Sequence, residues 1–198
     1  MSQGARKRAT YEDVLQAPEH MVAELFDGQL SLLPRPAPRH ARATTKLGAS
    51  LDGPFDNGRG GPGGWILLDE PEWHFDGDVM VPDLAGWRRE RMPSMPEEAY
   101  FTLAPDWICE VLSPSTMRID RMKKVPRYAR GGVSHVWLLD PLARSLEILR
   151  LTSSGYLLTQ SFLFGTEPDL QDGEVSDREV RAEPFDAVAL DLSVLWSR

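Results

Sequence analysis

The chain has 198 residues, of which 41% are hydrophobic and 26% are charged, a balance typical of one globular domain. This composition excludes a disordered tail, a collagen-like repeat and a disulfide scaffold, and no apolar run is long enough to span a bilayer. The single cysteine, Cys109, and the absence of an apolar segment after the basic start predict a cytoplasmic protein with no membrane partner. We expect one domain over residues 1–198, in which residues 1–9 form a flexible basic tail.

The net charge of −8 is unevenly distributed along the sequence. Residues 167–186 hold eight acidic side chains and two basic ones, whereas residues 118–130 hold six basic side chains and one acidic one. A local basic face can contact a phosphate backbone even on an acidic protein. The alternative, that residues 118–130 form the solvated face of a helix, stays open.

The first part of the chain predicts a helix over residues 11–17, a hairpin of strands 22–26 and 29–33, and a second helix over 40–51. Asp27-Gly28 favours the positive φ angles of the two-residue turn that would join the hairpin strands. Residues 52–64 are rich in glycine and proline and predict a loop. No Gly-Lys-Ser/Thr follows them, so a phosphate-binding loop is not indicated.

The rest of the chain predicts strands interrupted by one helix. We expect strands over residues 65–68, 72–75, 79–87 and 106–112, a helix over 117–130, a strand over 133–140, a hairpin of 145–151 and 156–164, and a short helix over 187–195. This order indicates a mixed α/β domain rather than a doubly wound nucleotide fold. Pro126 predicts either a kink in the helix or a regular helix that begins near Lys124.

Two acidic residues interrupt apolar strand sequence. Asp83 follows Val-Met-Val-Pro, and Glu110 lies within Ile-Cys-Glu-Val-Leu. Buried carboxylates are costly unless they are paired, hydrogen-bonded or bound to a cation, and oxygen ligands suit Mg²⁺ or Mn²⁺. Alternatively, each acid faces solvent or pairs with a lysine or arginine. Asp120, Lys124 and Tyr128 are spaced four apart and would share one face of a regular helix, which would direct Lys124 toward the end of the strand that carries Glu110. The alternative is that Asp120 and Lys124 form an ordinary ion pair on the surface of the helix.

These motifs resemble a known family. The resemblance is to the Uma-type restriction-endonuclease-like family of the PD-(D/E)XK nuclease superfamily, and it is carried by Val81-Pro82-Asp83-Leu84, by Glu-Val-Leu-Ser-Pro-Ser-Thr at 110–116, by the spaced Asp120, Lys124 and Tyr128, and by residues 132–141. It extends over about residues 11–196. It implies a restriction-endonuclease-like α/β core with a mixed, largely antiparallel central sheet flanked by helices.

The resemblance also implies a function, namely a metal-dependent phosphodiesterase that acts as a DNA endonuclease with Mg²⁺ or Mn²⁺. Asp83 and Glu110 match the two catalytic acids, and with the backbone carbonyl of Val111 they would hold the metal. Leu112 stands where the superfamily usually has its catalytic lysine, and Lys124 matches the position to which this family moves it. Supporting roles fall to Glu24, His40 and Asp120.

The expected partner is nucleic acid, with DNA favoured. Its phosphates would be contacted from the basic segment by Arg118, Arg121, Lys123 and Arg127. A homodimer is expected because a paired-strand cut is easiest with two copies of one site and two-fold dimers are the commonest assembly. Two other functions remain open: a catalytically inactive nuclease-like domain that binds protein or nucleic acid, and a nuclease of RNA or single strands.

Overall fold

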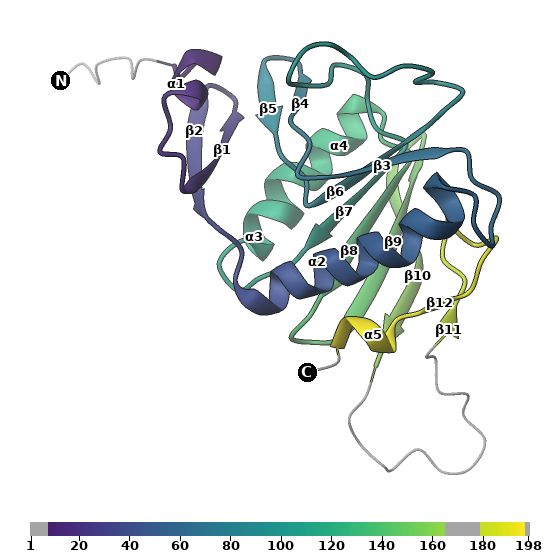
Figure 1. The fold of residues 1–198 in the computed structure, drawn as a ribbon. Helices are drawn as coiled ribbons and strands as arrows, with labels where there is room; N and C mark the ends of the chain where they lie inside the picture. The colour runs from purple at the N-terminus through teal and green to yellow at the C-terminus, as the bar shows by residue number, and fades with distance from the viewer. Residues whose placement is uncertain (1–7, 165–178, 197–198) are drawn as a thin grey trace.

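The computed structural model describes residues 8–164 and 179–196, so most of the basic tail and much of the acidic 167–186 segment lie outside the described residues. The described chain is a mixed α/β domain built on two main sheets, with a third sheet of two short strands (Figure 1). No helix in the described ranges is long and apolar enough to cross a membrane. The predicted fold class is confirmed.

The larger sheet has six strands in the order β10-β9-β8-β7-β6-β3. All neighbouring pairs are antiparallel except β7 and β8, which are parallel. The strands are β3 (Trp65–Asp69), β6 (Leu84–Arg88), β7 (Trp107–Val111), β8 (His135–Asp140), β9 (Ser145–Thr152) and β10 (Gly155–Leu163). A parallel pair needs a long crossover connection. The segment between β7 and β8 supplies it, and this is the segment that carries Lys124.

The smaller sheet has the order β2-β1-β5-β4. Its strands are β1 (Met21–Phe26), β2 (Gln29–Pro34), β4 (Trp73–Phe75) and β5 (Asp78–Met80), and they follow the short helix α1 (Tyr11–Leu15). The predicted hairpin forms around Asp27 and Gly28, both with positive φ. The single pairing of Leu25 with Val79 joins β1 to β5. This pairing holds the hairpin of β1 and β2 beside β5, the strand that comes just before β6 of the larger sheet.

Helices cover both faces of the larger sheet (Figure 1). On one face lies α2 (Pro38–Leu51), which continues as a π-helical turn over Asp52–Asp56 and buries Leu47 and Leu51 with alternate residues of β7 such as Cys109. On the other face lies α4 (Val125–Gly131), whose Tyr128 packs in a second apolar cluster. Because successive strand residues point to opposite faces, Glu110 points to the α4 side. Both faces are buried, so the charge of Glu110 lies within the protein.

The crossover begins with α3 (Met117–Ile119), widens into a π-helical turn over Asp120–Lys124, and ends in α4. Pro126 is the second residue of α4, so the helix that begins near Lys124 is the correct alternative. Proline has no N–H to donate to the preceding turn, and the wider π-helical turn tolerates this loss. The turn keeps Asp120, Lys124 and Tyr128 directed toward the same side.

The predicted boundaries differ from the observed ones where backbone chemistry intervenes. The expected strand 79–87 is divided, because Pro82 cannot donate to a ladder and the chain bends at Val81-Pro82-Asp83 between β5 and β6. The expected loop 52–64 begins later, after the π-helical turn that ends at Asp56. The expected helix 187–195 is shorter, since the short strands β11 (Glu179–Val180) and β12 (Leu190–Asp191) pair before α5 (Ser193–Trp196).

Candidate active site

The bend at Val81-Pro82-Asp83 brings Asp83 opposite Glu110. Strands β6 and β7 pair antiparallel with Leu84 facing Cys109, and extending this register by one residue aligns Asp83 with Glu110. Instead of continuing the ladder, the Oδ2 atom of Asp83 accepts a hydrogen bond of 2.7 Å from the backbone N–H of Val111. The same oxygen lies 3.2 Å from Nε2 of His40. The two acids predicted from the sequence are therefore held close together, Glu110 in β7 and Asp83 in the bend just before β6.

Glu110 is buried beneath the crossover helices, and both of its oxygens have partners. Its Oε1 accepts a hydrogen bond from the hydroxyl of Tyr128, and the Nζ of Lys124 lies 3.3 Å from each carboxylate oxygen. Burial raises the pKa of Glu110 well above its usual value, against the charge of Lys124, which lowers it. Burial, followed by the charge of Glu110, also raises the pKa of Tyr128, so the phenol keeps its proton and donates it in the hydrogen bond.

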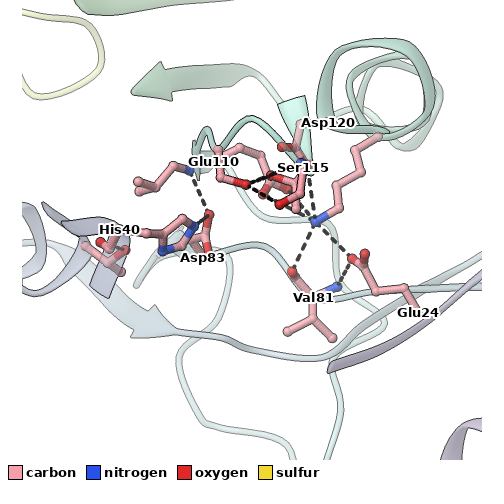
Figure 2. A network of polar contacts seen from close by, with 12 residues as sticks. Glu24, His40, Val81, Asp83, Glu110, Ser115 and Asp120 are labelled. Atoms are coloured by element: carbon pink, nitrogen blue, oxygen red, sulfur yellow. Dashed lines mark hydrogen bonds and ion pairs between the residues drawn. The ribbon is translucent and has the colours of Figure 1, made fainter. Parts of the chain in front are cut away.

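The ammonium group of Lys124 lies among three carboxylates, those of Glu24, Glu110 and Asp120, which Figure 2 labels. It is 3.0 Å from Glu24, 3.3 Å from Glu110 and 3.7 Å from Asp120, and it donates a longer hydrogen bond of 3.4 Å to the carbonyl of Val81. Burial alone lowers the pKa of Lys124, but the surrounding carboxylates, led by Glu110, raise it well above its usual value. Lys124 is therefore a buried, charged lysine.

Glu24 comes from β1 of the smaller sheet and is fully buried. Its Oε1 accepts a hydrogen bond of 2.9 Å from the N–H of Val81, and the same oxygen pairs with Lys124. Its Oε2 is buried and has no hydrogen-bond partner within the described residues. A buried, unsatisfied carboxylate oxygen is costly, so this atom marks a position where a further ligand would be stabilising.

His40 and Asp120 complete the cluster. His40 lies in the first turn of α2, directed at Asp83 (Figure 2). Burial lowers the pKa of His40, yet the hydrogen bond to Asp83 and the charge of that residue raise it more, so the imidazole binds a proton more readily than usual. Burial raises the pKa of Asp120 to about 6 against the lowering effect of Lys124. Every predicted catalytic and supporting side chain is thus present in one cluster.

The cluster faces a small pocket of about 50 Å³ that is lined by residues from both sheets, α2 and the crossover. Lining side chains include His40, Asp83, Glu110, Asp120 and Lys124. Within the described ranges no three histidine, cysteine, aspartate or glutamate side chains are grouped so that they could hold a metal ion by themselves. A metal at this pocket would need backbone, water or substrate oxygens in addition.

Most of the positive charges of the basic segment 118–130 form ion pairs within the protein. Arg127 is buried and forms ion pairs with Asp78 and Asp27, and Arg121 forms two hydrogen bonds of 2.7 and 2.9 Å with Glu147. The charge of Arg127 is therefore largely buried and engaged in these two pairs, and its expected role in nucleic-acid binding stays a prediction. By contrast, Arg118 and Lys123 are exposed, in line with the expectation.

Sequence reasoning missed two features of the site. Tyr128 was placed on the face of Lys124, but its hydrogen bond to Glu110 was not predicted, although a tyrosine four residues after a buried lysine was a usable signal. The backbone of Val81, which donates to Glu24 and accepts from Lys124, left no signal in the sequence. Cys109 is buried, and burial raises the pKa of its thiol, which opposes reactivity.

Comparison with known proteins identifies relatives of the chain in fold and in sequence. The chain is similar to a solved structure from Anabaena variabilis described as a putative nuclease belonging to DUF820, with 21% identity and a TM-score of 0.69 over 94% of this chain and 97% of that chain. No curated protein matches the chain. The model of the Uma2 family, described as a putative restriction endonuclease, matches residues 9–181. This match covers most of the sequence, and the chain therefore belongs to the Uma2 family.

Proposed function

We propose that this protein is a metal-dependent nuclease that hydrolyses phosphodiester bonds, with DNA as its substrate. The observation that carries the proposal is that Asp83, Glu110 and Lys124, which come from three separate elements, all line one pocket. Buried acids beside a lysine are expensive to maintain, and such arrangements are concentrated at catalytic sites. The family description and the nuclease-like fold support the same reaction class.

The donor atoms fit a hard divalent ion. Mg²⁺ is usually held by one or two carboxylates together with waters and substrate oxygens, so Asp83, Glu110 and the carbonyl of Val111 form a suitable set for Mg²⁺ or Mn²⁺. The unsatisfied Oε2 of Glu24 supports the need for a further cation in this region. When bound, the ion would lower the pKa of a bound water and stabilise charge on the phosphate oxygens.

The protein side chains have separate tasks in this proposal. His40 and the N–H of Val111 orient the carboxylate of Asp83, while the hydroxyl of Tyr128 fixes that of Glu110. Lys124 supplies a permanent positive charge that orients the attacking water or neutralises charge developing on the phosphate. Because Lys124 also balances the buried acids before substrate arrives, the site is organised in advance of the reaction.

Plasmid cutting tests the proposal directly. Purified protein is incubated with supercoiled plasmid and Mg²⁺ or Mn²⁺, and we expect cutting that Asp83→Asn and Glu110→Gln each abolish. Matched controls are Asp76→Asn and Glu147→Gln, which change carboxylates in exposed or partly exposed ion pairs outside the pocket and should cut normally. Circular dichroism establishes that each variant is folded. Cutting that survives both pocket substitutions would reject the proposed site.

The same assay separates the alternatives. RNA and single-stranded DNA are offered beside the plasmid, and preferential cutting of either would change the proposed substrate. Binding without cutting on any substrate would favour an inactive binding module. The proposal for a duplex includes a homodimer, because two symmetry-related sites reach both strands. Light scattering of the protein bound to duplex DNA would refute the dimer if it gave a single copy.

A further inference from the structure

The acidic pocket has a larger neighbour, which we call the α2 pocket because it lies between α2 and strands β3, β6 and β7. Three chain segments line both pockets. In α2, His40 lines the acidic pocket and Thr44, one helical turn later, lines the α2 pocket; the Thr44 hydroxyl donates a hydrogen bond of 3.1 Å to the carbonyl of His40. The other two segments give one residue to the acidic pocket and its chain neighbour to the α2 pocket, namely Asp83 with Leu84 and Glu70 with Asp69. The two pockets are therefore adjacent.

The residues of the α2 pocket come from facing surfaces of the helix and the sheet. Thr44, Gly48 and Asp52 are spaced four apart, so they follow one another along a single helix face. Leu67 of β3 packs against the buried cluster beneath α2, and Asp69, two residues later in the same strand, points to the same face of the sheet. Asp69 therefore lines the pocket from the side opposite the helix.

The α2 pocket combines an apolar floor with hydrogen-bond acceptors. The floor includes Leu51, Leu84 and Trp107, each at most 6% exposed. Two exposed carboxylates, those of Asp52 and Asp69, also line the pocket, and the carboxylate of Asp69 has no hydrogen-bond or ion-pair partner within residues 8–164 and 179–196. Two carboxylates repel a phosphate but accept hydrogen bonds from amino groups. The pocket therefore suits a neutral group with apolar faces and N–H donors.

The two pockets together match the parts of a nucleotide. The acidic pocket, of about 50 Å³, accommodates a few water-sized groups and hence part of a phosphate, whereas the α2 pocket has a volume of about 260 Å³. Pockets for drug-sized ligands typically have about 300–1,000 Å³, so the α2 pocket can enclose a smaller ring. Consecutive Cα atoms are about 3.8 Å apart and a helical turn rises about 5.4 Å. The lining thus changes from one pocket to the other within a distance that one sugar can span.

We infer that the α2 pocket binds the base of a nucleotide whose phosphate enters the acidic pocket, and that it favours a base with an exocyclic amino group. The inference rests on the proposed function, because it takes the phosphate of the cleaved bond as its fixed point. Asp69 accepts a hydrogen bond from the amino group, while the apolar floor contacts the ring. In a duplex the base must first leave its stack, which is easiest where the base is mismatched or unpaired.

Binding of nucleotide fragments tests the inference without any cutting. In calorimetric titrations with excess Ca²⁺, the protein is offered deoxycytidine monophosphate, deoxyuridine monophosphate and deoxyribose phosphate, each as the 3′ and the 5′ phosphate. Cytosine carries an amino group where uracil has a carbonyl, and the sugar phosphate has no base. In at least one of the two phosphate series, we expect the uridine compound to bind about 5–10-fold more weakly than the cytidine compound. The sugar phosphate should bind more weakly than the cytidine compound by about 10-fold or more.

Two variants separate the parts of the α2 pocket. Asp69→Asn changes an exposed side chain and should remove the preference for cytosine, because an amide both donates and accepts. A Cβ at position 48 would lie 3.6 Å from Leu84, in ordinary contact, so Gly48→Leu directs a side chain into the pocket. It should weaken both nucleotides to the level of the sugar phosphate and leave binding of the sugar phosphate unchanged. Glu90→Gln and Ala49→Leu, at exposed positions outside both pockets, are the matched controls and should bind as the wild type does.

Several results would overturn the inference. These are equal binding of the nucleotides and the sugar phosphate, no nucleotide binding at all, a cytosine preference that survives Asp69→Asn, and an equal loss in either control. Thermal unfolding establishes that each variant is folded, and Asp69→Asn decides alone if Gly48→Leu does not fold. A protein that shows the expected preferences but cuts no substrate contradicts the proposed function and leaves the base pocket standing. A protein that cuts plasmid but binds the sugar phosphate as tightly as the nucleotides contradicts the base pocket alone.

Discussion

Replacing Lys124 with methionine removes a buried charge while largely preserving the volume of the side chain. The ammonium lies 3.0 Å from Glu24 and 3.3 Å from Glu110, and all three side chains are at most 4% exposed. With an effective dielectric constant of about 20, a charge pair at about 3 Å is worth about 5 kcal/mol before the cost of desolvation. Removing one partner from a buried pair typically costs about 3–5 kcal/mol. We expect a loss of this size at neutral pH, a large share of a typical domain stability of about 5–15 kcal/mol.

The loss should depend on pH in a defined direction. Burial raises the pKa of both Glu110 and Asp120, and Lys124 lowers both, so the variant should have still higher carboxyl pKa values in the folded state. A carboxyl group with a raised folded pKa does not destabilise the fold below its unfolded pKa, and its full destabilising effect appears above its folded pKa. The variant should therefore lose more stability at about pH 8 than at about pH 5.

Urea unfolding followed by tryptophan fluorescence measures this loss, since the chain has six tryptophans. Lys123→Met is the matched control, because Lys123 is the exposed neighbour in the same helical turn and should change stability by no more than about 0.5 kcal/mol. If Lys124→Met costs less than about 1 kcal/mol at pH 8, or the same amount at both pH values, the lysine does not balance buried charge as argued.

Three further predictions concern the surroundings of the site. A divalent ion at a concentration of 100 times its dissociation constant should stabilise the wild type against thermal unfolding by about 2.7 kcal/mol. Asp83→Asn should lose this stabilisation, and a variant that keeps all of it would show that the ion binds elsewhere. Tyr128→Phe removes a hydrogen bond to the buried carboxyl group of Glu110 and should cost about 1–3 kcal/mol in urea, so an unchanged midpoint would contradict the bond. Arg127→Met breaks a buried ion pair and should cost about 3–5 kcal/mol, whereas Arg121→Met breaks a more exposed pair and should cost about 1 kcal/mol or less; equal costs would contradict this contrast.

The sequence predicted the acids of the site because carboxylates rarely interrupt apolar strands without a reason. Asp83 and Glu110 stood out against their neighbours, and the spacing of four placed Asp120, Lys124 and Tyr128 on one helix face. Periodicity is a local signal, and these relations are local. The structure confirms the common face even though a π-helical turn replaces the regular helix over Asp120–Lys124.

Relations across the fold were harder to predict from single positions. Residues 79–87 were expected to form one strand, because the apolar pattern continues through Pro82, but the bend there transfers the chain from one sheet to the other. The basic segment was expected to face nucleic acid, yet the partners of Arg121 and Arg127 lie far away in the sequence, at Glu147 and at Asp27 and Asp78. Charge composition shows which side chains could form ion pairs, but it does not show which distant residues the fold places beside them.

The position of the site at the junction of both sheets explains how its buried acids and its lysine find partners inside the protein. Glu24 belongs to the smaller sheet, Glu110 to the larger sheet and Lys124 to the crossover that links two strands of the larger one. Any two of these elements without the third would leave a buried charge with too few partners, a cost of several kcal/mol. We therefore expect docking of the two sheets and assembly of the site to be energetically coupled. Arg127 reinforces this coupling, since it joins α4 to both the β1–β2 turn and β5 through its two ion pairs. A variant that loosens the smaller sheet should thus reduce stability and impair cutting together, even though it lies outside the pocket.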